Sequence, residues 1–477
     1  MTRILFIAYY FPPMGGPAVQ RALRFVKYLP SKGYLPSVIA GPASLNDRWT
    51  PTDGTLTLGI PSEVSLHAAN GQPPASESGI LKKTQTWLAR PSRFARWWAN
   101  TATDMAFRAA DGARLIFTTM SPFESATAAA ESSRRLGIPW VADLRDPWAL
   151  DDVRAYTSSF HRKLDMLRMD KLLSTASLII MNTPQAAIDV KNMLPGLRTK
   201  RVICIPNGFD REDFQCPVEP RADSKFRIVH SGAMYTDKGL WERRRNFHRL
   251  LGGIEAGVDI FTRSPVFLLD AITRWCKKEP RIAADLEVMF VGGLTTDDQA
   301  AIASSKVRDL TRSTGALSHA ESLKLVRTAD LLFLPMHNLP PGRRCRSVPG
   351  KTYEYMASGR PILGAVPEGD ARDFLSQCGT ALLCRPDDVE GMVEQLNTAY
   401  DAWKAGRPVG RMDRTFVDQF EGRRQTAKLA EEFGRVLQDV VSAEGGFRGD
   451  GPEEAAVWNG LDVEGQCRAT GKEHRES

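Results

Sequence analysis

Two series of short apolar runs, each alternating with helical patterns, constrain the fold of this chain more than any other feature. In the first series, runs such as residues 4–10 and 178–181 are separated by amphipathic stretches such as residues 18–29. A second series begins at Phe226 and continues to residue 365. Apolar strands that alternate with helices form parallel sheets covered on both faces. The sequence therefore predicts a pair of similar α/β domains.

Helix signals and composition shifts divide the chain further. Ser318 with Glu321 predicts a capping box at the start of a helix over 319–328, and Gly359 is placed to end a helix over 350–358. The Gly-, Pro- and Ser-rich residues 42–80 are typical of a long loop. The predicted organisation is a first Rossmann-like domain over 1–210, a linker over 211–225, a second such domain over 226–416, an amphipathic helix over 417–441 and a disordered tail over 442–477.

Composition narrows the classes of protein that the chain can belong to. Its 477 residues carry a net charge of +7, which is too small and too spread out for a dedicated nucleic-acid binder. The apolar start of the chain is short, meets Pro12-Pro13 and lacks a cleavage site, so we expect a strand there and no signal peptide. The seven cysteines are scattered without a C-x-x-C pair, which favours a reducing, cytoplasmic location over disulfides or a zinc site.

Two polar segments follow predicted strands of the first domain. Gly15 and Gly16 stand directly before a helix, where free backbone N–H groups favour an anion, although a plain tight turn has the same pattern. In the second segment, Asp143, Arg145 and Asp146 directly follow the predicted strand over residues 140–142. Ligands of open α/β sheets bind at the carboxyl ends of such strands. These three charges either pair with one another or contact a ligand.

A basic segment in the second domain opens a helix. Residues 343–354 read RRCRSVPGKTYE and follow the predicted strand at 331–334. Basic side chains and free N–H groups at a helix start suit a diphosphate, and a carboxylate in the first turn suits the two hydroxyls of a ribose. Lys351 and Glu354 are also three residues apart, so an internal salt bridge is the alternative.

Six segments in register resemble a known family: YYFPPMGGPAVQRALRFVKYL, VADLRDPW, IPNGFD, HSGAMY, VGG and VPGKTYEYMASGRPIL. Together they resemble family 4 glycosyltransferases of the GT-B fold, particularly bacterial enzymes of cell-surface polysaccharide synthesis. The resemblance covers residues 3–440. It implies an acceptor domain, a donor domain, a UDP- or GDP-linked sugar in the cleft between them, and a final helix that crosses back to the first domain.

The resemblance also implies roles for individual residues. Glu354 matches the family's ribose-binding glutamate and Lys351 the lysine before it. Gly232 ends the strand after which the family's phosphate ligands lie. An insertion over 236–261 follows, so Arg263 is favoured as the phosphate-binding arginine, with Lys238 as the alternative.

Two departures from the family pattern concern the sugar. The family's first glutamate, which is separated from the second by seven residues, is replaced by Arg346. Arg145-Asp146 stands where many relatives have His-Asp, and because an arginine cannot act as a base, we expect it to contact the acceptor or stabilise charge on the leaving phosphate. The family implies hexosyl transfer with retention, assisted by the leaving diphosphate, and no protein nucleophile is assigned. The absence of any D-x-D motif predicts that no metal and no further cofactor is needed.

Residues 82–98 predict a contact with an anionic membrane surface. Six Lys/Arg stand against one acid between 80 and 110, with Trp97 and Trp98 among them. The alternative is a solvated helix whose tryptophans pack on the domain.

Other functions are open at this point. A GT-B nucleotide-sugar epimerase or phosphorylase shares the twin domains, but a phosphorylase would need a pyridoxal-binding lysine and no lysine stands in such a context. The change at Arg346 would also fit a non-catalytic nucleotide-sugar-binding partner of another transferase. A nicotinamide dehydrogenase is disfavoured, because neither half has the G-x-G-x-x-G fingerprint.

Overall fold

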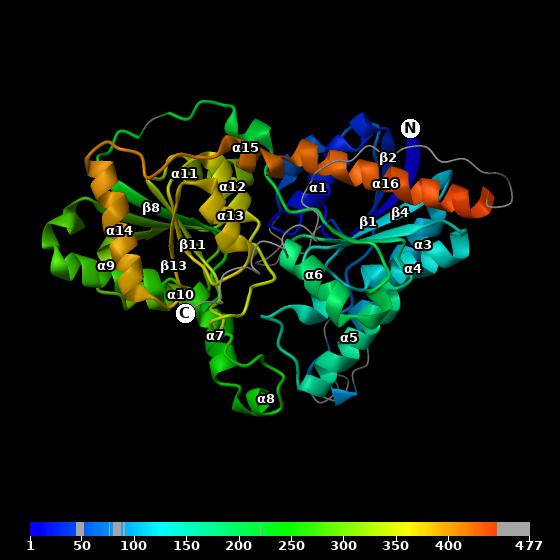
Figure 1. Cartoon of the computed structure of the whole chain (residues 1–477), viewed down its shortest axis with the longest axis horizontal. Helices are drawn as coiled ribbons and strands as arrows, with labels where there is room; N and C mark the ends of the chain where they lie inside the picture. Colours follow the sequence, from blue (N-terminus) through cyan, green and yellow to red (C-terminus); the bar gives the residue numbers. More distant parts are fainter. Residues whose placement is uncertain (44–51, 76, 80–86, 89–90, 220, 446–477) are drawn as a thin grey trace, which may run out of the picture.

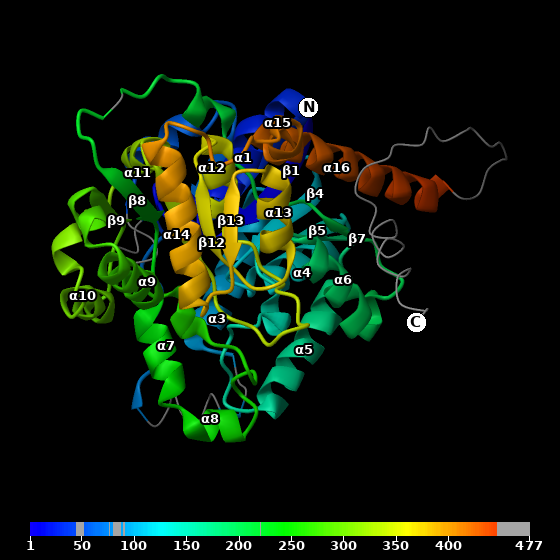
Figure 2. The same ribbon diagram turned by 60° about the vertical axis from the view of Figure 1, so that its left-hand side comes forward.

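Two parallel sheets lie side by side in the protein, each between layers of helices (Figure 1). The computed structural model describes residues 1–43, 52–75, 77–79, 87–88, 91–219 and 221–445. The two predicted Rossmann-like domains are therefore confirmed, and Figure 2 shows strands β12 and β13 of the second sheet between α14 on one side and α13 on the other.

The first sheet has the strand order β3-β2-β1-β4-β5-β6-β7. Alternate side chains of β1 point to opposite faces, so Leu5 and Ile7 pack under α3 and α4 while Ile4 and Phe6 pack under α1 and α16. The elements are β1 (Thr2–Ala8), α1 (Gln20–Tyr28), β2 (Tyr34–Ala40), β3 (Ser65–Ala68), α3 (Arg93–Arg108), β4 (Ala113–Met120), α4 (Ser125–Leu136), β5 (Trp140–Leu144), α5 (Ser159–Leu173), β6 (Leu178–Met181), α6 (Pro184–Met193) and β7 (Val202–Cys204).

The second sheet has the order β10-β9-β8-β11-β12-β13. One face packs against α9 and α14, and the other against α11, α12 and α13. The elements are β8 (Phe226–Ser231), α7 (Thr236–Arg243), α8 (Asn246–Leu250), α9 (Val266–Lys278), β9 (Leu286–Val291), α10 (Thr296–Ala303), β10 (Thr311–Ser313), α11 (His319–Arg327), β11 (Leu331–Pro335), α12 (Lys351–Ser358), β12 (Ile362–Ala365), α13 (Asp370–Cys378), β13 (Ala381–Cys384) and α14 (Val389–Lys404).

In each sheet, the order of the strands reverses beside one central strand. The chain order reverses beside β1, which lies between β2 and β4, and beside β8, which lies between β9 and β11. Loops at the carboxyl ends of such strands form a crevice. Gly15 and Gly16 follow β1, Gly232 follows β8, and Lys351 opens the helix after β11. The predicted site residues therefore come from the edges that form the crevices.

The final helix crosses back to the first domain, as expected, but it begins later than predicted. Residues 417–441 were expected to form one helix. Instead α15 (Arg414–Val417) and a short 3-10 turn precede α16 (Gly422–Gly445). Glu421 is extended and bridges to Phe209, whose N–H donates to the Phe420 carbonyl at 3.2 Å, so the chain turns there. Figure 1 shows α16 lying over the first domain.

Three edge strands escaped prediction: β3 and β10 lack an apolar run, and β13 is apolar but only four residues long. β3 lies within residues 42–80, which were expected to be loop throughout, and all four of its side chains are exposed at the sheet edge. The edge strands β10 and β13 of the second sheet were likewise missed. The predicted capping box at Ser318 and the left-handed Gly359 that ends α12 are both present.

The expected membrane role of the tryptophan pair is wrong. Trp98 is fully buried and its Nε1 donates to Ser125 Oγ at 2.9 Å, while Trp97 packs against the same core. They lie on the face of α3 that covers the sheet, which is the alternative noted above. Part of the predicted membrane segment, residues 82–86 and 89–90, lies outside the described residues. Of the tail predicted over 442–477, residues 442–445 belong to α16 and the others lie outside the described residues. No helix in the described ranges is both long and apolar enough to cross a bilayer.

Candidate functional site

Cationic side chains cluster where β8 and α12 meet, and we refer to this cluster of Lys351, Arg263 and the neighbouring His230 as the cationic pocket. Lys351 Nζ lies 3.1 Å from His230 Nε2, and the Nδ1 of His230 donates to the Phe333 carbonyl at 3.0 Å. This second bond leaves Nε2 as an acceptor for the ammonium, so the imidazole is neutral. Burial and then the charge of Lys351 hold the pKa of His230 well below its usual range.

Gly232 leaves room for the lysine. Its φ of 104° is in the left-handed region, and a Cβ placed there would stand 2.8 Å from Lys351 Nζ. Any other residue would be strained at this φ, and its Cβ would displace the ammonium from its present position. The lysine in turn lies in the first turn of α12, where Gly350 precedes it and no side-chain cap is present.

A second cation, Arg263, acts on the same pocket. Burial and then the charge of Arg263 lower the pKa of Lys351 to about 7, against the opposing effect of Glu354. The guanidinium of Arg263 stacks 3.9 Å from the centre of the Tyr235 ring. Two cations that repel each other across a partly buried site are stabilised by an anion between them. Lys238, the alternative phosphate ligand, instead donates to the Val153 carbonyl of the first domain at 2.8 Å.

Glu354 faces the first domain and not Lys351. Its Oε1 lies 3.5 Å from Arg24 of α1 and 4.0 Å from His319. Burial opposes a charge on His319, but Asp213 and Glu354 together raise its pKa. The internal salt bridge considered for Lys351 and Glu354 is absent from the contacts of the described residues. Sequence reasoning missed Arg24 because its position on a buried helix face gives no signal of a polar partner.

The segment after β5 is held by the backbone around it. Arg145 donates to the carbonyls of Met120 at 2.9 Å and Ser121 at 3.0 Å, and also to that of Ala18. Asp143 is fully buried and accepts from Arg21 Nη2 at 2.7 Å, so it pairs within the domain. The guanidinium of Arg145 thus connects the turn after Gly16 to β5, and the catalytic role expected for it stays a prediction.

Asp146 is the exposed member of this segment. Burial, followed by the charge of Asp146, raises the pKa of the neighbouring Asp151 to about 6. Two carboxylates therefore lie close together at the carboxyl edge of the first sheet. Asp151 carried no motif and was not predicted.

Arg346 holds the two domains together. Its Nε lies 2.6 Å from Asp189 and its Nη1 lies 2.6 Å from Asp152, both in the first domain. Arg343 also donates to Asp152, at 2.7 Å, and Thr183 Oγ1 donates to the Arg346 carbonyl at 2.7 Å. Where the family pattern has its first glutamate, this chain has a cation that pairs across the cleft.

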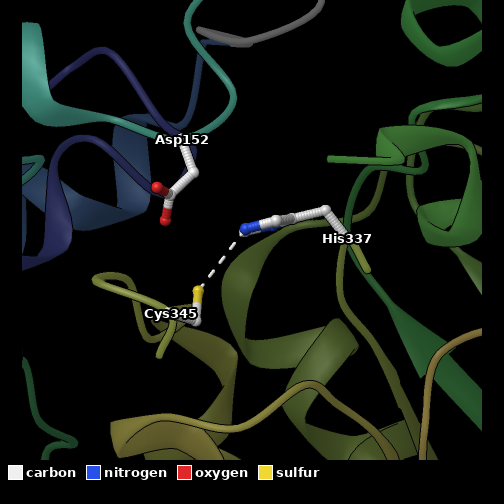
Figure 3. A group of neighbouring side chains, drawn as sticks. All are labelled: Asp152, His337 and Cys345. Carbon is white, nitrogen blue, oxygen red and sulfur yellow. Dashed lines mark hydrogen bonds between the residues drawn. The ribbon is translucent and has the colours of Figure 1, made fainter. Parts of the chain in front are cut away.

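Asp152, His337 and Cys345 converge beneath this contact, as Figure 3 shows. One potential ligand atom from each lies within 4.8 Å of the others, and Cys345 Sγ is 3.4 Å from His337 Nε2. Burial and the nearby charge of Arg263 lower the pKa of His337 to about 3, and burial raises that of Cys345 to about 12. Since the surroundings are cationic, they favour pairing of Asp152 with arginine over a divalent ion. That no metal takes part in the reaction stays a prediction.

These features describe a protein with two Rossmann-like domains and a cluster of cationic side chains at the carboxyl edge of the second sheet. Solved structures of the same fold are GT-B proteins. The sucrose-phosphate synthase of Thermosynechococcus elongatus aligns with 14% identity over 93% of this chain and 100% of its own, with a TM-score of 0.60. A glycosyltransferase of Rickettsia africae ESF-5 aligns with 12% identity over 92% of this chain and 99% of its own, with a TM-score of 0.57. HepE of Anabaena, solved in complex with UDP-glucose, aligns with 15% identity over 91% of this chain and 100% of its own, with a TM-score of 0.56.

The family comparison agrees with the fold. Residues 262–402 match the family model described as Glycosyl transferases group 1. This match spans most of the second domain, including Arg263, Lys351 and Glu354. No curated protein sequence matches the chain. The predicted resemblance to GT-B glycosyltransferases is confirmed at the level of fold and family model.

Proposed function

We propose that this protein is a family 4-type, retaining and metal-independent hexosyltransferase. It takes a sugar from a UDP- or GDP-sugar and passes it to a glycan or lipid-linked acceptor in cell-surface polysaccharide synthesis. The observation that carries the proposal is the pairing of Lys351 with a neutral His230 beside Arg263, because two neighbouring cations of this kind favour binding of a diphosphate. The UDP-glucose bound by the Anabaena neighbour supplies a ligand of the required chemistry.

The second domain supplies the contacts to the donor. Lys351 and Arg263 stabilise the diphosphate, with Gly15, Gly16 and Gly232 allowing close approach of the backbone, and Glu354 accepts from the ribose hydroxyls. Charge that develops on the leaving diphosphate is greatest in the transition state. Preorganised cations therefore lower the barrier more than they tighten binding of the intact donor.

The first domain supplies the acceptor side. Asp146 is exposed at the edge of β5, where an acceptor hydroxyl can donate to its carboxylate. Arg145 holds the turn that carries it. The leaving diphosphate takes the proton of the attacking hydroxyl on the same face of the sugar, so no protein nucleophile is assigned. The six described cysteines are all free thiols, in keeping with a cytoplasmic location.

Incubation with a panel of nucleotide sugars, with and without EDTA, tests the proposal. We expect one donor to be hydrolysed slowly without an acceptor, at a rate that chelation does not change, and the released sugar to keep its anomeric configuration. Loss of turnover with EDTA would contradict metal independence, and inversion would contradict retention. Binding of a donor without hydrolysis or transfer to any acceptor would favour the non-catalytic partner, which the pairing of Arg346 across the cleft keeps as an alternative.

A further inference from the structure

Exposed apolar side chains gather at one end of the molecule. Seven of the twelve large apolar side chains that are exposed within the described residues come from residues 87–88, α5 and the insertion that forms α7 and α8. Leu250 is 82% exposed and Phe160 is 63% exposed. An apolar patch of this kind on a folded protein marks a surface that contacts something else. We refer to it as the tip surface, and its main members are Trp87, Phe160, Leu167, Trp241, Phe247 and Leu250.

The three segments of the tip surface are in contact. The N–H of Tyr156 donates to the Gly253 carbonyl at 2.7 Å, and that of Ser159 donates to the Leu251 carbonyl at 2.8 Å. A Cβ on Gly253 would lie 2.2 Å from the Tyr156 carbonyl oxygen, so the insertion returns tightly against the start of α5. The Trp87 carbonyl lies 3.1 Å from His161 Nε2. Figures 1 and 2 both show α8 at the margin of the molecule beside α5.

Basic side chains surround the apolar ones. Between Thr236 and Gly252 there are five Lys/Arg and two acids. Arg244 and Arg245 are exposed, and Arg245 stacks 4.9 Å from the Trp241 ring. No ion pair or hydrogen bond joins the guanidinium of Arg244 to any described residue. Glu242 is only 3% exposed, so its charge is directed inward. The exposed charge of the insertion is therefore predominantly positive.

Helix spacing places the apolar and basic groups on one face of α5 as well. Phe160, Lys163 and Leu167 recur at three and four residues, and all three are exposed. Asp165, which stands between Lys163 and Leu167 in the sequence, accepts a hydrogen bond from Tyr156 Oη at 2.7 Å. Aromatic and leucine side chains ringed by arginine and lysine match the boundary between headgroups and acyl chains of an anionic bilayer.

We propose that the tip surface docks the protein on an anionic lipid bilayer, with Phe247 and Leu250 entering the headgroup region and Arg244 and Arg245 contacting the phosphates. The five-residue α8 presents these four side chains from the end of a short projection, which suits shallow insertion. This surface replaces the one expected around Trp97 and Trp98. The proposal can be tested separately from sugar transfer, because binding of the protein to vesicles is measured without donor or acceptor.

Flotation of the full chain with vesicles tests the proposal. We expect binding to vesicles that contain phosphatidylglycerol, little binding to pure phosphatidylcholine, and release at high salt. Phe247→Ser/Leu250→Ser and, separately, Arg244→Glu/Arg245→Glu should each weaken the partition coefficient at least about tenfold. Unchanged melting temperatures will show that the variants are folded.

Matched controls change the same chemistry elsewhere. Leu58→Ser removes a side chain that is 87% exposed on the first domain, and Lys306→Glu/Lys324→Glu reverses two exposed charges of the second. Both controls should bind like the wild type. Absence of wild-type binding, equal binding by the tip variants, or equal losses in the controls would overturn the proposal. A dimer in sedimentation velocity that Phe247→Ser/Leu250→Ser dissociates would assign the surface to self-association instead.

Discussion

The ammonium of Lys351 lies 3.1 Å from Nε2 of His230, although Glu354 stands one turn along the same helix. Glu354 is directed to Arg24 of the opposite domain, at 3.5 Å. The lysine therefore lies beside a neutral imidazole and a second cation, Arg263, and no carboxylate among the described residues pairs with it. Lys351 and Glu354 therefore do not form a helix-stabilising salt bridge, and both are placed to contact a ligand.

Lys351→Ala should weaken UDP or GDP far more than it weakens uridine or guanosine, because only the diphosphate presents the charge. Loss of a charge-assisted contact of about 1.5–3 kcal/mol corresponds to a fall in affinity and in kcat/KM of about 10–150-fold. Calorimetry with each nucleoside and its diphosphate measures the difference.

Glu354→Gln is the companion variant. It should weaken nucleoside and diphosphate by similar factors, because the ribose is common to both. If both variants kept wild-type affinities and showed only a small drop in melting temperature, Lys351 and Glu354 would have to be withdrawn from the site.

Binding of the diphosphate should draw a proton onto Lys351. Its pKa in the free protein is about 7, so above that pH the amine is mostly neutral. A bound anion favours the ammonium and raises the pKa. At about pH 8 we expect uptake of roughly one proton per UDP, less uptake near pH 6, and an affinity that falls as the pH rises above 7.

Calorimetry in buffers of different ionisation enthalpy measures this uptake. Lys351→Met is the control and should show almost no buffer dependence at the same pH. Equal uptake by wild type and Lys351→Met would assign the proton to another group.

Gly232→Ala should damage the pocket while the sheet stays folded. The added Cβ would stand 2.8 Å from Lys351 Nζ, so the ammonium must move, and UDP affinity should fall at least about tenfold. Gly33→Ala is a matched control, because Gly33 has a similar φ of 89° but nothing within 4 Å of the added atom. Both variants carry the backbone strain, and only Gly232→Ala should lose affinity. Equal affinities in the two would contradict the assignment.

Arg346 should act on stability and not on the nucleotide. Because it pairs with Asp189 and Asp152 across the cleft, Arg346→Ala should lower the free energy of unfolding by about 1–3 kcal/mol and leave UDP affinity unchanged. A double-mutant cycle with Asp189→Ala, followed by urea unfolding, should give a coupling energy of about 0.5–3 kcal/mol. The exposed pair of Arg308 and Asp309 is the control and should couple weakly. A coupling energy near zero for Arg346 and Asp189 would show that this contact between the domains does not contribute to the free energy of unfolding.

Local signals in the sequence were sufficient for much of the fold. The buried strands and several helix boundaries follow from apolar runs, a capping box at Ser318 and a left-handed glycine at Gly359. The edge strands β3, β10 and β13 could not be predicted, because a strand with a polar or short sequence is specified by its neighbour in the sheet. The start of α16 depends on the bridge between Phe209 and Glu421, which are far apart in the chain.

The chain's own sequence determined that two Rossmann-like domains form, and it placed Gly232, Lys351 and Glu354 at the ends of strands and the start of a helix. Tertiary structure alone decided the partners of the charged groups: His230 for Lys351, Arg24 for Glu354 and Asp189 for Arg346. It also buried Trp98 and exposed Phe247. The physical reason is that secondary structure depends on near neighbours, whereas charge pairing and burial depend on which surfaces the two domains bring together.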